Sequence, residues 1–178
     1  MILTDDELVR EALNGTQERF RELFERYGKL VFRQSYALTG SSQEAEDLLQ
    51  DVFCQAYLKL NQYRGPGSFK KWILTIGRNQ TINFLKKKGV KTFSIDFQDE
   101  TRSEFADSRQ DVQKALEMKE SVSSLLNSCE PVVREVLLLR LVEDLSYREI
   151  SEVVGLKEEH LRQMVSRGLA QLKKGAEA

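Results

Sequence analysis

Apolar residues recur along most of the chain at intervals of three and four positions, the spacing of one face of an α-helix. The clearest case is residues 16–40, where the rhythm is carried by Phe20, Leu23, Phe24, Tyr27 and Val31. No segment alternates apolar and polar residues over a useful length, as a half-buried strand would. The pattern therefore predicts an all-α protein.

Residues that favour helix ends mark the boundaries of the predicted helices. Three pairs fit the capping box, in which side chains satisfy free N–H groups of the first turn: Thr4 with Glu7, Ser41 with Glu44, and Ser146 with Glu149. We also expect Thr16 to cap a helix, and Gly40 and Gly155 to end helices in the left-handed conformation. The predicted helices cover residues 4–14, 16–40, 41–60, 69–88, 112–126, 132–142, 146–154 and 158–173.

Two interruptions divide this series of helices. Residues 63–68 are too rich in Gly and Pro to be helical. Residues 91–111 lose the apolar periodicity and become polar and acidic, which indicates a flexible linker. The expected organisation is two small helical domains, residues 1–90 and 112–178, joined by this acidic linker.

The second domain has the spacing of a helix-turn-helix: a short helix, Gly155, and then a longer helix. In that motif the second helix lies in the DNA major groove. Its predicted outward side chains can meet base edges or phosphates: His160, Arg162, Gln163, Ser166 and Arg167. An ordinary helical hairpin with a solvated face is the alternative, and the spacing favours DNA binding.

The net charge of −1 conceals a strong segregation of charge. Residues 52–95 contain nine Lys and Arg residues and no Asp or Glu, which indicates a surface for an anionic partner. The same stretch contains Tyr63, Phe69, Trp72 and Phe84, and exposed aromatic rings among cations are typical of single-strand binding. The alternative places the rings in the core, which we expect for Phe84 and part of Trp72.

Other classes of protein find little support in the sequence. It has no signal-peptide pattern at its start and no apolar run near the ~20 residues that a membrane span needs, so we expect a cytoplasmic protein. Cys54, Cys129 and the single His160 lack metal-site spacing, and we expect both cysteines to be buried free thiols. We expect no cofactor, no metal and no enzymatic activity.

Several motifs together resemble a known family. Residues 44–53, Tyr63-Arg64-Gly65, residues 68–73 and Arg78-Asn79 resemble the first domain of extracytoplasmic-function (ECF) sigma factors, which give bacterial RNA polymerase its promoter specificity. Residues 136–140, residues 145–150 and Gly155-Leu156 resemble the second domain of these factors. The resemblance covers nearly the whole chain, in order, with an acidic linker between the two parts.

The resemblance implies three sets of site residues and three partners: core polymerase, promoter DNA and an anti-sigma factor. Polymerase docking falls on Asp47, Leu48, Gln50, Asp51 and Phe53. The residues that the resemblance assigns to binding the near-start promoter element and the melted strand are Arg64, Ser68, Lys70, Trp72, Arg78, Asn79, Asn83, Lys86 and Lys87. The farther element falls to the last helix through the five residues given above, with Arg140 supporting it through phosphate.

The last helix departs from the usual pattern of this family. Glu158 and Glu159 stand at its start, where small and basic residues are usual, and Met164 replaces a basic residue. Asn83 stands where Asp is common. Recognition of the farther element is therefore expected to be weak, unusual in sequence or assisted by another protein. The alternative function is a free-standing helix-turn-helix regulator that binds duplex DNA without polymerase. A protein-binding adaptor is a third possibility, but it gives no role to the acid-free residues 52–95.

Overall fold

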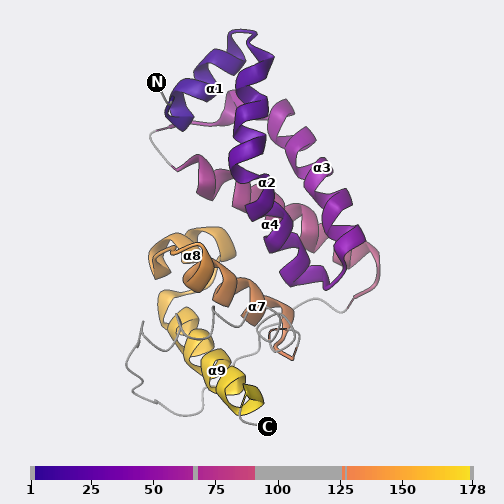
Figure 1. Ribbon diagram of the computed structural model, residues 1–178, viewed down its shortest axis with the longest axis vertical. Coiled ribbons are helices and arrows are strands. Elements are labelled where there is room, and N and C mark those ends of the chain that lie inside the picture. The colour runs from indigo at the N-terminus through magenta and orange to yellow at the C-terminus, as the bar shows by residue number, and fades with distance from the viewer. Residues whose placement is uncertain (1–2, 66–67, 91–125, 127, 177–178) are drawn as a thin grey trace.

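The computed structural model describes residues 3–65, 68–90, 126 and 128–176. Within these ranges the regular structure is helical throughout, which confirms the all-α prediction, and the helices form two groups (Figure 1). The first comprises α1 (Asp5–Leu13), α2 (Gln17–Thr39), α3 (Ser42–Leu58), the 3₁₀ turn η1 (Leu60–Gln62) and α4 (Phe69–Lys87). The second comprises α7 (Pro131–Leu137), the π-helical turn η2 (Leu138–Val142), α8 (Tyr147–Val154) and α9 (Glu158–Ala176).

The proposed linker, residues 91–111, lies outside the described residues, as does all but the end of the helix predicted at 112–126. Within the described part of the chain, no helix combines the length and apolar composition that crossing a bilayer requires.

Capping explains most of the helix boundaries. Thr4 with Glu7, and Ser146 with Glu149, form complete capping boxes, as predicted. The Ser41 hydroxyl accepts from the Glu44 backbone N–H at 3.3 Å, but the Glu44 carboxylate pairs with Lys88 instead of closing the box. Gly40 and Gly155 end α2 and α8 with φ of +70° and +78°, so these predictions are confirmed. The prediction for Thr16 is wrong, because its side chain makes no capping hydrogen bond.

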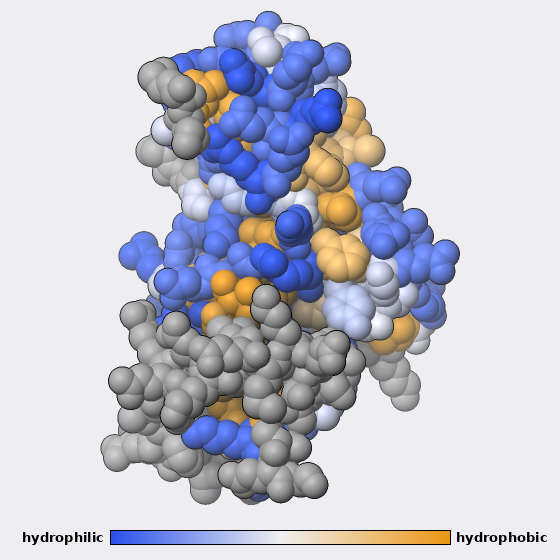
Figure 2. All heavy atoms as spheres, in the orientation of Figure 1, coloured by the Kyte–Doolittle hydropathy of each residue, from blue (hydrophilic) through white to orange (hydrophobic). Residues whose placement is uncertain are grey.

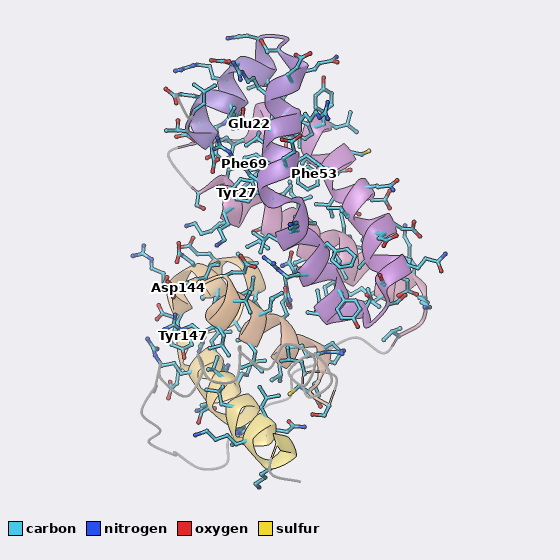
Figure 3. All side chains as sticks on the ribbon, viewed as in Figure 1. Glu22, Tyr27, Phe53, Phe69, Asp144 and Tyr147 are labelled. Carbon is cyan, nitrogen blue, oxygen red and sulfur yellow. The ribbon has the colours of Figure 1, made fainter. Side chains whose placement is uncertain are left out.

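The first helical group encloses a core built around Phe69. This ring is fully buried, and Tyr27 lies beside it with ring centroids 5.4 Å apart (Figure 3). The Tyr27 hydroxyl donates to Asp5, which ties α2 to the start of α1. Burial, and then the neighbouring Asp5 carboxylate, raise the pKa of Tyr27 above its ordinary value. The apolar face predicted for residues 16–40 is therefore part of the core of the first domain, and it helps to hold that domain together.

The second group has its own core, which includes Val136, Leu139, Ile150 and Leu161. Met164 also belongs to it and is 2% exposed. Met164, which stands where the resemblance leads us to expect a basic residue, therefore lies on the face of α9 that packs inward.

The two groups are in contact through apolar side chains. Leu30 of α2 and Leu74 of α4 belong to the same buried cluster as the core of the second group. Helix α2 contacts α7, and the first half of α4, which carries Lys71 and Arg78, contacts α8 and α7. The second domain therefore packs on the first in this structure.

The two cysteines differ in burial. Cys129 is buried and a free thiol, as expected, and burial raises its pKa. Cys54 is also a free thiol but is exposed, so the expectation that it is buried is wrong. Its neighbours Val52, Phe53 and Ala56 face the core. Cys54 therefore lies beside the buried face of α3 and not on it.

The capping geometry gives a matched pair of stability predictions. Ser146→Ala removes a side chain that accepts from the Glu149 N–H at 3.2 Å, so we expect it to lower the free energy of unfolding by about 1 kcal/mol. Thr16→Ala removes an N-cap side chain that makes no such bond, and we expect a change below about 0.5 kcal/mol. Urea denaturation followed by circular dichroism measures both, and equal losses would contradict the assignment.

Candidate functional site

Helix α4 carries the basic residues on two distinct faces. Lys70, Leu74 and Arg78 follow one another at intervals of four and therefore share one face. Leu74 is buried against the second domain, so this face is covered. Four other predicted DNA-binding residues of the helix are exposed: Asn79, Asn83, Lys86 and Lys87.

Arg78 lies in a buried polar cluster between the two domains. Its guanidinium pairs with the carboxylate of Glu135, which is fully buried in α7. The other oxygen of that carboxylate accepts from the Gln34 side-chain amide at 2.9 Å. Burial lowers the pKa of Arg78 to about 10, so the guanidinium remains charged at neutral pH.

Lys70 and Lys71 also meet acids of the second domain. The Lys70 ammonium donates to the backbone carbonyl of Glu143 at 2.8 Å and lies 3.6 Å from its carboxylate. Arg33 of α2 pairs with the same carboxylate. The Lys71 ammonium lies 2.5 Å from the Glu152 carboxylate of α8. Two predicted DNA-binding cations, Lys70 and Arg78, are therefore occupied within the protein.

Contacts between aromatic rings join the segment before α4 to the first turn of that helix. The Trp72 ring contacts those of Tyr63 and Phe69 at centroid distances of 5.5 and 5.4 Å, and Trp72 is half-buried. Ser68 caps α4 by accepting from the Lys71 N–H at 3.4 Å. Arg64 is exposed and donates to the backbone of residue 61 at 3.0 Å. Trp72 and Ser68 thus shape the start of α4, and Arg64 remains open to solvent.

In α9, Arg162 and Arg167 are exposed, whereas His160, Gln163 and Ser166 are half-buried. These five side chains belong to the second helix of the helix-turn-helix, as the sequence predicted. Arg162 lies 3.1 Å from the Glu158 carboxylate one turn earlier. The acidic start of this helix is therefore partly neutralised within the helix itself.

Tyr147, the first residue of α8, was not among the predicted site residues. The guanidinium carbons of Arg140 and Arg162 lie 5.1 and 4.8 Å from its ring centroid, within cation–π range. The Arg140 side chain is only 12% exposed, so it packs against the ring more than it reaches into solvent. In the sequence, the available hint was an aromatic residue at the start of the helix-turn-helix. Only the fold brings the two arginines to its ring.

Helix α3 presents an acidic ridge, which we define as Asp47, Gln50 and Asp51, all exposed. The other two predicted docking residues, Leu48 and Phe53, are 3% and 5% exposed and belong to the core. Side chains so buried have little surface to offer a partner, so the exposed part of the predicted docking set is the acidic ridge.

An apolar strip lies beside the ridge, between α2 and α3 (Figure 2). It includes Phe24, Tyr57 and Leu58, which are 39%, 47% and 74% exposed. Tyr57 contacts Phe20 at a centroid distance of 5.0 Å, and Phe24 contacts Phe53 at 4.8 Å. Exposed apolar surface next to charged residues is typical of a protein-binding face. The apolar periodicity of α2 predicted that Phe24 is buried, so no pattern in the sequence pointed to this strip.

Within the described ranges, no three His, Cys, Asp or Glu side chains gather into a group able to hold a metal ion.

Comparison with known families gives two matches in the order of the two domains. Residues 23–90 match the family model described as "Sigma-70 region 2", and residues 119–172 match "Sigma-70, region 4". The acidic ridge and α4 lie within the first match, and the helix-turn-helix lies within the second except for the last residues of α9.

Curated relatives match this chain over most of their own length. The chain is 28% identical over 153 residues to the ECF RNA polymerase sigma factor SigM of Bacillus subtilis, covering 85% of this chain and 91% of that protein. It is 27% identical over 164 residues to the ECF RNA polymerase sigma-E factor of Escherichia coli, covering 85% and 83% of the two chains.

Two solved structures share the fold. CnrH in complex with the cytosolic domain of CnrY has a TM-score of 0.67 at 22% identity, covering 96% of this chain and 95% of that one. RpoE of Bartonella quintana, in complex with the anti-sigma factor NepR, has a TM-score of 0.64 at 21% identity, covering 89% and 97%. Since both sigma-70 regions, the curated relatives and the fold agree, this chain belongs to the ECF branch of the sigma-70 family of RNA polymerase sigma factors.

Proposed function

We propose that this protein is an alternative sigma factor in which each of three surfaces has one task. The acidic ridge of α3 docks on core RNA polymerase, α4 with the preceding segment holds the near-start promoter element, and α9 reads the farther element. The observation that carries the proposal is the placement of an exposed acidic ridge and an acid-free basic helix in one bundle that matches sigma-70 region 2.

The docking surface combines charge with apolar area. Asp47 and Asp51 lie one turn apart and are both exposed, so their charges act on the same partner surface. The apolar strip beside them supplies the surface that binding proteins bury at the centre of an interface. A basic, partly apolar helix of the polymerase fits this combination.

The melted strand is assigned to α4 and the segment before it. Arg64, Lys86 and Lys87 are exposed cations that neutralise phosphates, and Asn79 and Asn83 offer hydrogen bonds to bases. The half-buried Trp72 leaves part of a ring for stacking. Lys70 and Arg78 belong to the same set once they are released from their acidic partners.

The farther element is assigned to α9. Arg162, Gln163, Ser166 and Arg167 face the major groove in this proposal, together with His160. Arg140 supports them mainly by packing against Tyr147, which holds Arg162 in place. The proposal therefore changes Arg140 from a direct phosphate contact to a positioning residue.

The protein performs no catalysis of its own in this proposal, requires no cofactor or metal, and acts in the cytoplasm, where promoter DNA and polymerase are found. Solved relatives in the family are complexes with other proteins, one of them named an anti-sigma factor. An anti-sigma factor is accordingly proposed as a third partner, beside core polymerase and DNA.

The direct test is transcription of randomly sheared genomic DNA by bacterial core polymerase, with and without the protein. We expect discrete start sites that depend on the protein, because a sigma factor selects promoters. Alignment of the upstream sequences then shows the two elements. Binding to duplex DNA as a dimer without any polymerase-dependent starts would favour the free-standing regulator instead.

A second test addresses docking. Asp47→Arg combined with Asp51→Arg reverses both charges of the acidic ridge, and we expect affinity for core polymerase to fall at least about tenfold. Glu18→Arg combined with Glu25→Arg makes the same change of net charge at exposed positions of α2 and serves as the control. Fluorescence anisotropy with labelled protein measures both, and equal losses would refute the ridge as the docking site.

A third test addresses Tyr147. Tyr147→Leu removes the ring from both arginines, and we expect holoenzyme binding to promoter duplex to weaken about fivefold, since a cation–π contact contributes about 1 kcal/mol. Tyr147→Phe keeps the ring and should retain wild-type binding. Binding of a core-polymerase complex to a probe lacking the farther element should be unchanged in both variants. A loss there would indicate general misfolding rather than lost positioning.

A further inference from the structure

The first turn of α1 lies against the segment that precedes α4. The Tyr63 hydroxyl donates to Oδ1 of the Asp6 carboxylate at 2.8 Å, a contact between residues 57 positions apart. Helix α1 also contacts η1, the turn directly before Tyr63. The match to sigma-70 region 2 begins at residue 23, so α1 lies outside it. The family match therefore gives this helix no role, although α1 touches the segment that is proposed to hold the near-start element.

The same carboxylate faces the backbone at Gly65. A Cβ placed on Gly65 would lie 2.9 Å from Asp6 Oδ1 and 3.2 Å from Asp6 Cγ, too close for a side chain to fit without a shift. Moving the carboxylate aside to make room would disturb its hydrogen bond with the Tyr63 hydroxyl. Glycine at position 65 therefore permits this close approach, and one carboxylate contacts the chain on both sides of Arg64.

Two DNA-binding groups of the proposed function are connected to Asp6 in this way. The Arg64 side chain is exposed, and its guanidinium donates to the backbone carbonyl of residue 61 at 3.0 Å. The Tyr63 ring, held through its hydroxyl, contacts the half-buried Trp72 ring at a centroid distance of 5.5 Å. Asp6 is thus linked to Trp72 through the Tyr63 side chain and to Arg64 through the backbone on either side of it.

The start of α1 is itself anchored, so Asp6 is carried on a fixed turn. The neighbouring Asp5 carboxylate accepts from the Tyr27 hydroxyl and, at 3.0 Å, from the Arg26 guanidinium. Arg26 also donates to the Leu3 backbone carbonyl at 2.7 Å. These bonds hold the first turn of α1 on α2. A hydrogen bond from Tyr63 to a carboxylate on this turn can therefore keep the following segment in one geometry.

We propose that Asp6 is a positioning residue for binding of the near-start promoter element. Its carboxylate holds residues 63–65 in the geometry in which Arg64 reaches a phosphate and the exposed part of the Trp72 ring meets a base. A segment that is ordered in advance loses less conformational entropy when DNA binds, and this raises affinity without any new contact. The inference rests on the proposed function, in which this segment and α4 hold the near-start element.

The sign of one substitution separates positioning from simple electrostatics. Asp6→Ala removes a negative charge from the neighbourhood of DNA, so electrostatics alone predicts tighter binding. Positioning predicts an affinity about fivefold lower, the factor expected when one more interface side chain has to be immobilised on binding. Asp6→Asn keeps an oxygen that can accept from the Tyr63 hydroxyl, so this variant should bind at least as tightly as wild type.

The measurement is binding of the holoenzyme to two pre-melted promoter probes, one with the near-start element from mapped start sites and one with that element scrambled. Tyr63→Phe removes the other partner of the same hydrogen bond and should lower affinity for the first probe as much as Asp6→Ala. The double variant should lose no more than either single variant, because both remove one interaction. Glu11→Ala breaks another contact of α1, the ion pair with Arg19 at 2.6 Å, and is the matched control.

The outcomes separate this inference from the proposed function. A wild-type holoenzyme that does not distinguish the two probes would refute the proposed function, and the role of Asp6 with it. A wild-type preference that Asp6→Ala leaves unchanged or strengthens would refute only the positioning role. An equal loss in Glu11→Ala would mean that any loosening of α1 has the same effect, and the specific role of Asp6 would be refuted.

Trp72 provides a readout that needs neither DNA nor polymerase. It is the only tryptophan of the chain, so its fluorescence reports on this position alone. Asp6→Ala and Tyr63→Phe should make Trp72 more accessible to quenching by acrylamide, whereas Asp6→Asn and Glu11→Ala should leave the quenching unchanged. Circular dichroism checks that each variant keeps its helices. Unchanged quenching in Asp6→Ala would refute the positioning role, even if DNA binding fell.

Discussion

The fully buried carboxylate of Glu135 is the constraint on which the arrangement of the two domains depends. A buried charge is costly unless it is paired, and removing one partner of such a pair typically costs about 3–5 kcal/mol. Two partners of Glu135 come from the other domain, Arg78 and Gln34. As long as this carboxylate is excluded from water, α7 has to remain against α2 and α4. The surrounding pairs of Glu143 and Glu152 extend the same constraint to the start of α4.

The same constraint connects structure with function. A sigma factor offers anionic DNA a row of cations, and a row of cations attracts any carboxylate nearby. In this chain the acid-free segment 52–95 leaves α4 without neutralising charges of its own, so acids of the second domain supply them. The second domain thereby combines a helix-turn-helix with acids that meet α4. One of these acids, Glu152, belongs to α8, so the first helix of the motif takes part in both.

The helix-turn-helix shows how local chemistry compensates for an unusual sequence. Two glutamates open α9, where they favour the positive end of the helix dipole but would repel phosphate. Arg162 offsets one of them by pairing with Glu158, and the Tyr147 ring holds the same guanidinium from the other side. Met164, which departs from the usual basic residue, is buried and so leaves the charge of the outer face unaltered.

The helices, most of their caps and the helix-turn-helix could be predicted from the amino-acid sequence, because they follow from apolar periodicity and from contacts within a few residues. Ser146 with Glu149, and the left-handed Gly155, are of this local kind. The family was indicated separately, by the resemblance of several motifs to those of known members. Which side chains are buried and which are exposed depends instead on tertiary packing. Leu48 and Phe53 proved to be core, Cys54 proved to be exposed, and Tyr147 gained two arginines from elsewhere in the chain. Above all, the pairing of Arg78 with Glu135 joins residues 57 positions apart, and no local pattern encodes a contact that depends on how two domains pack.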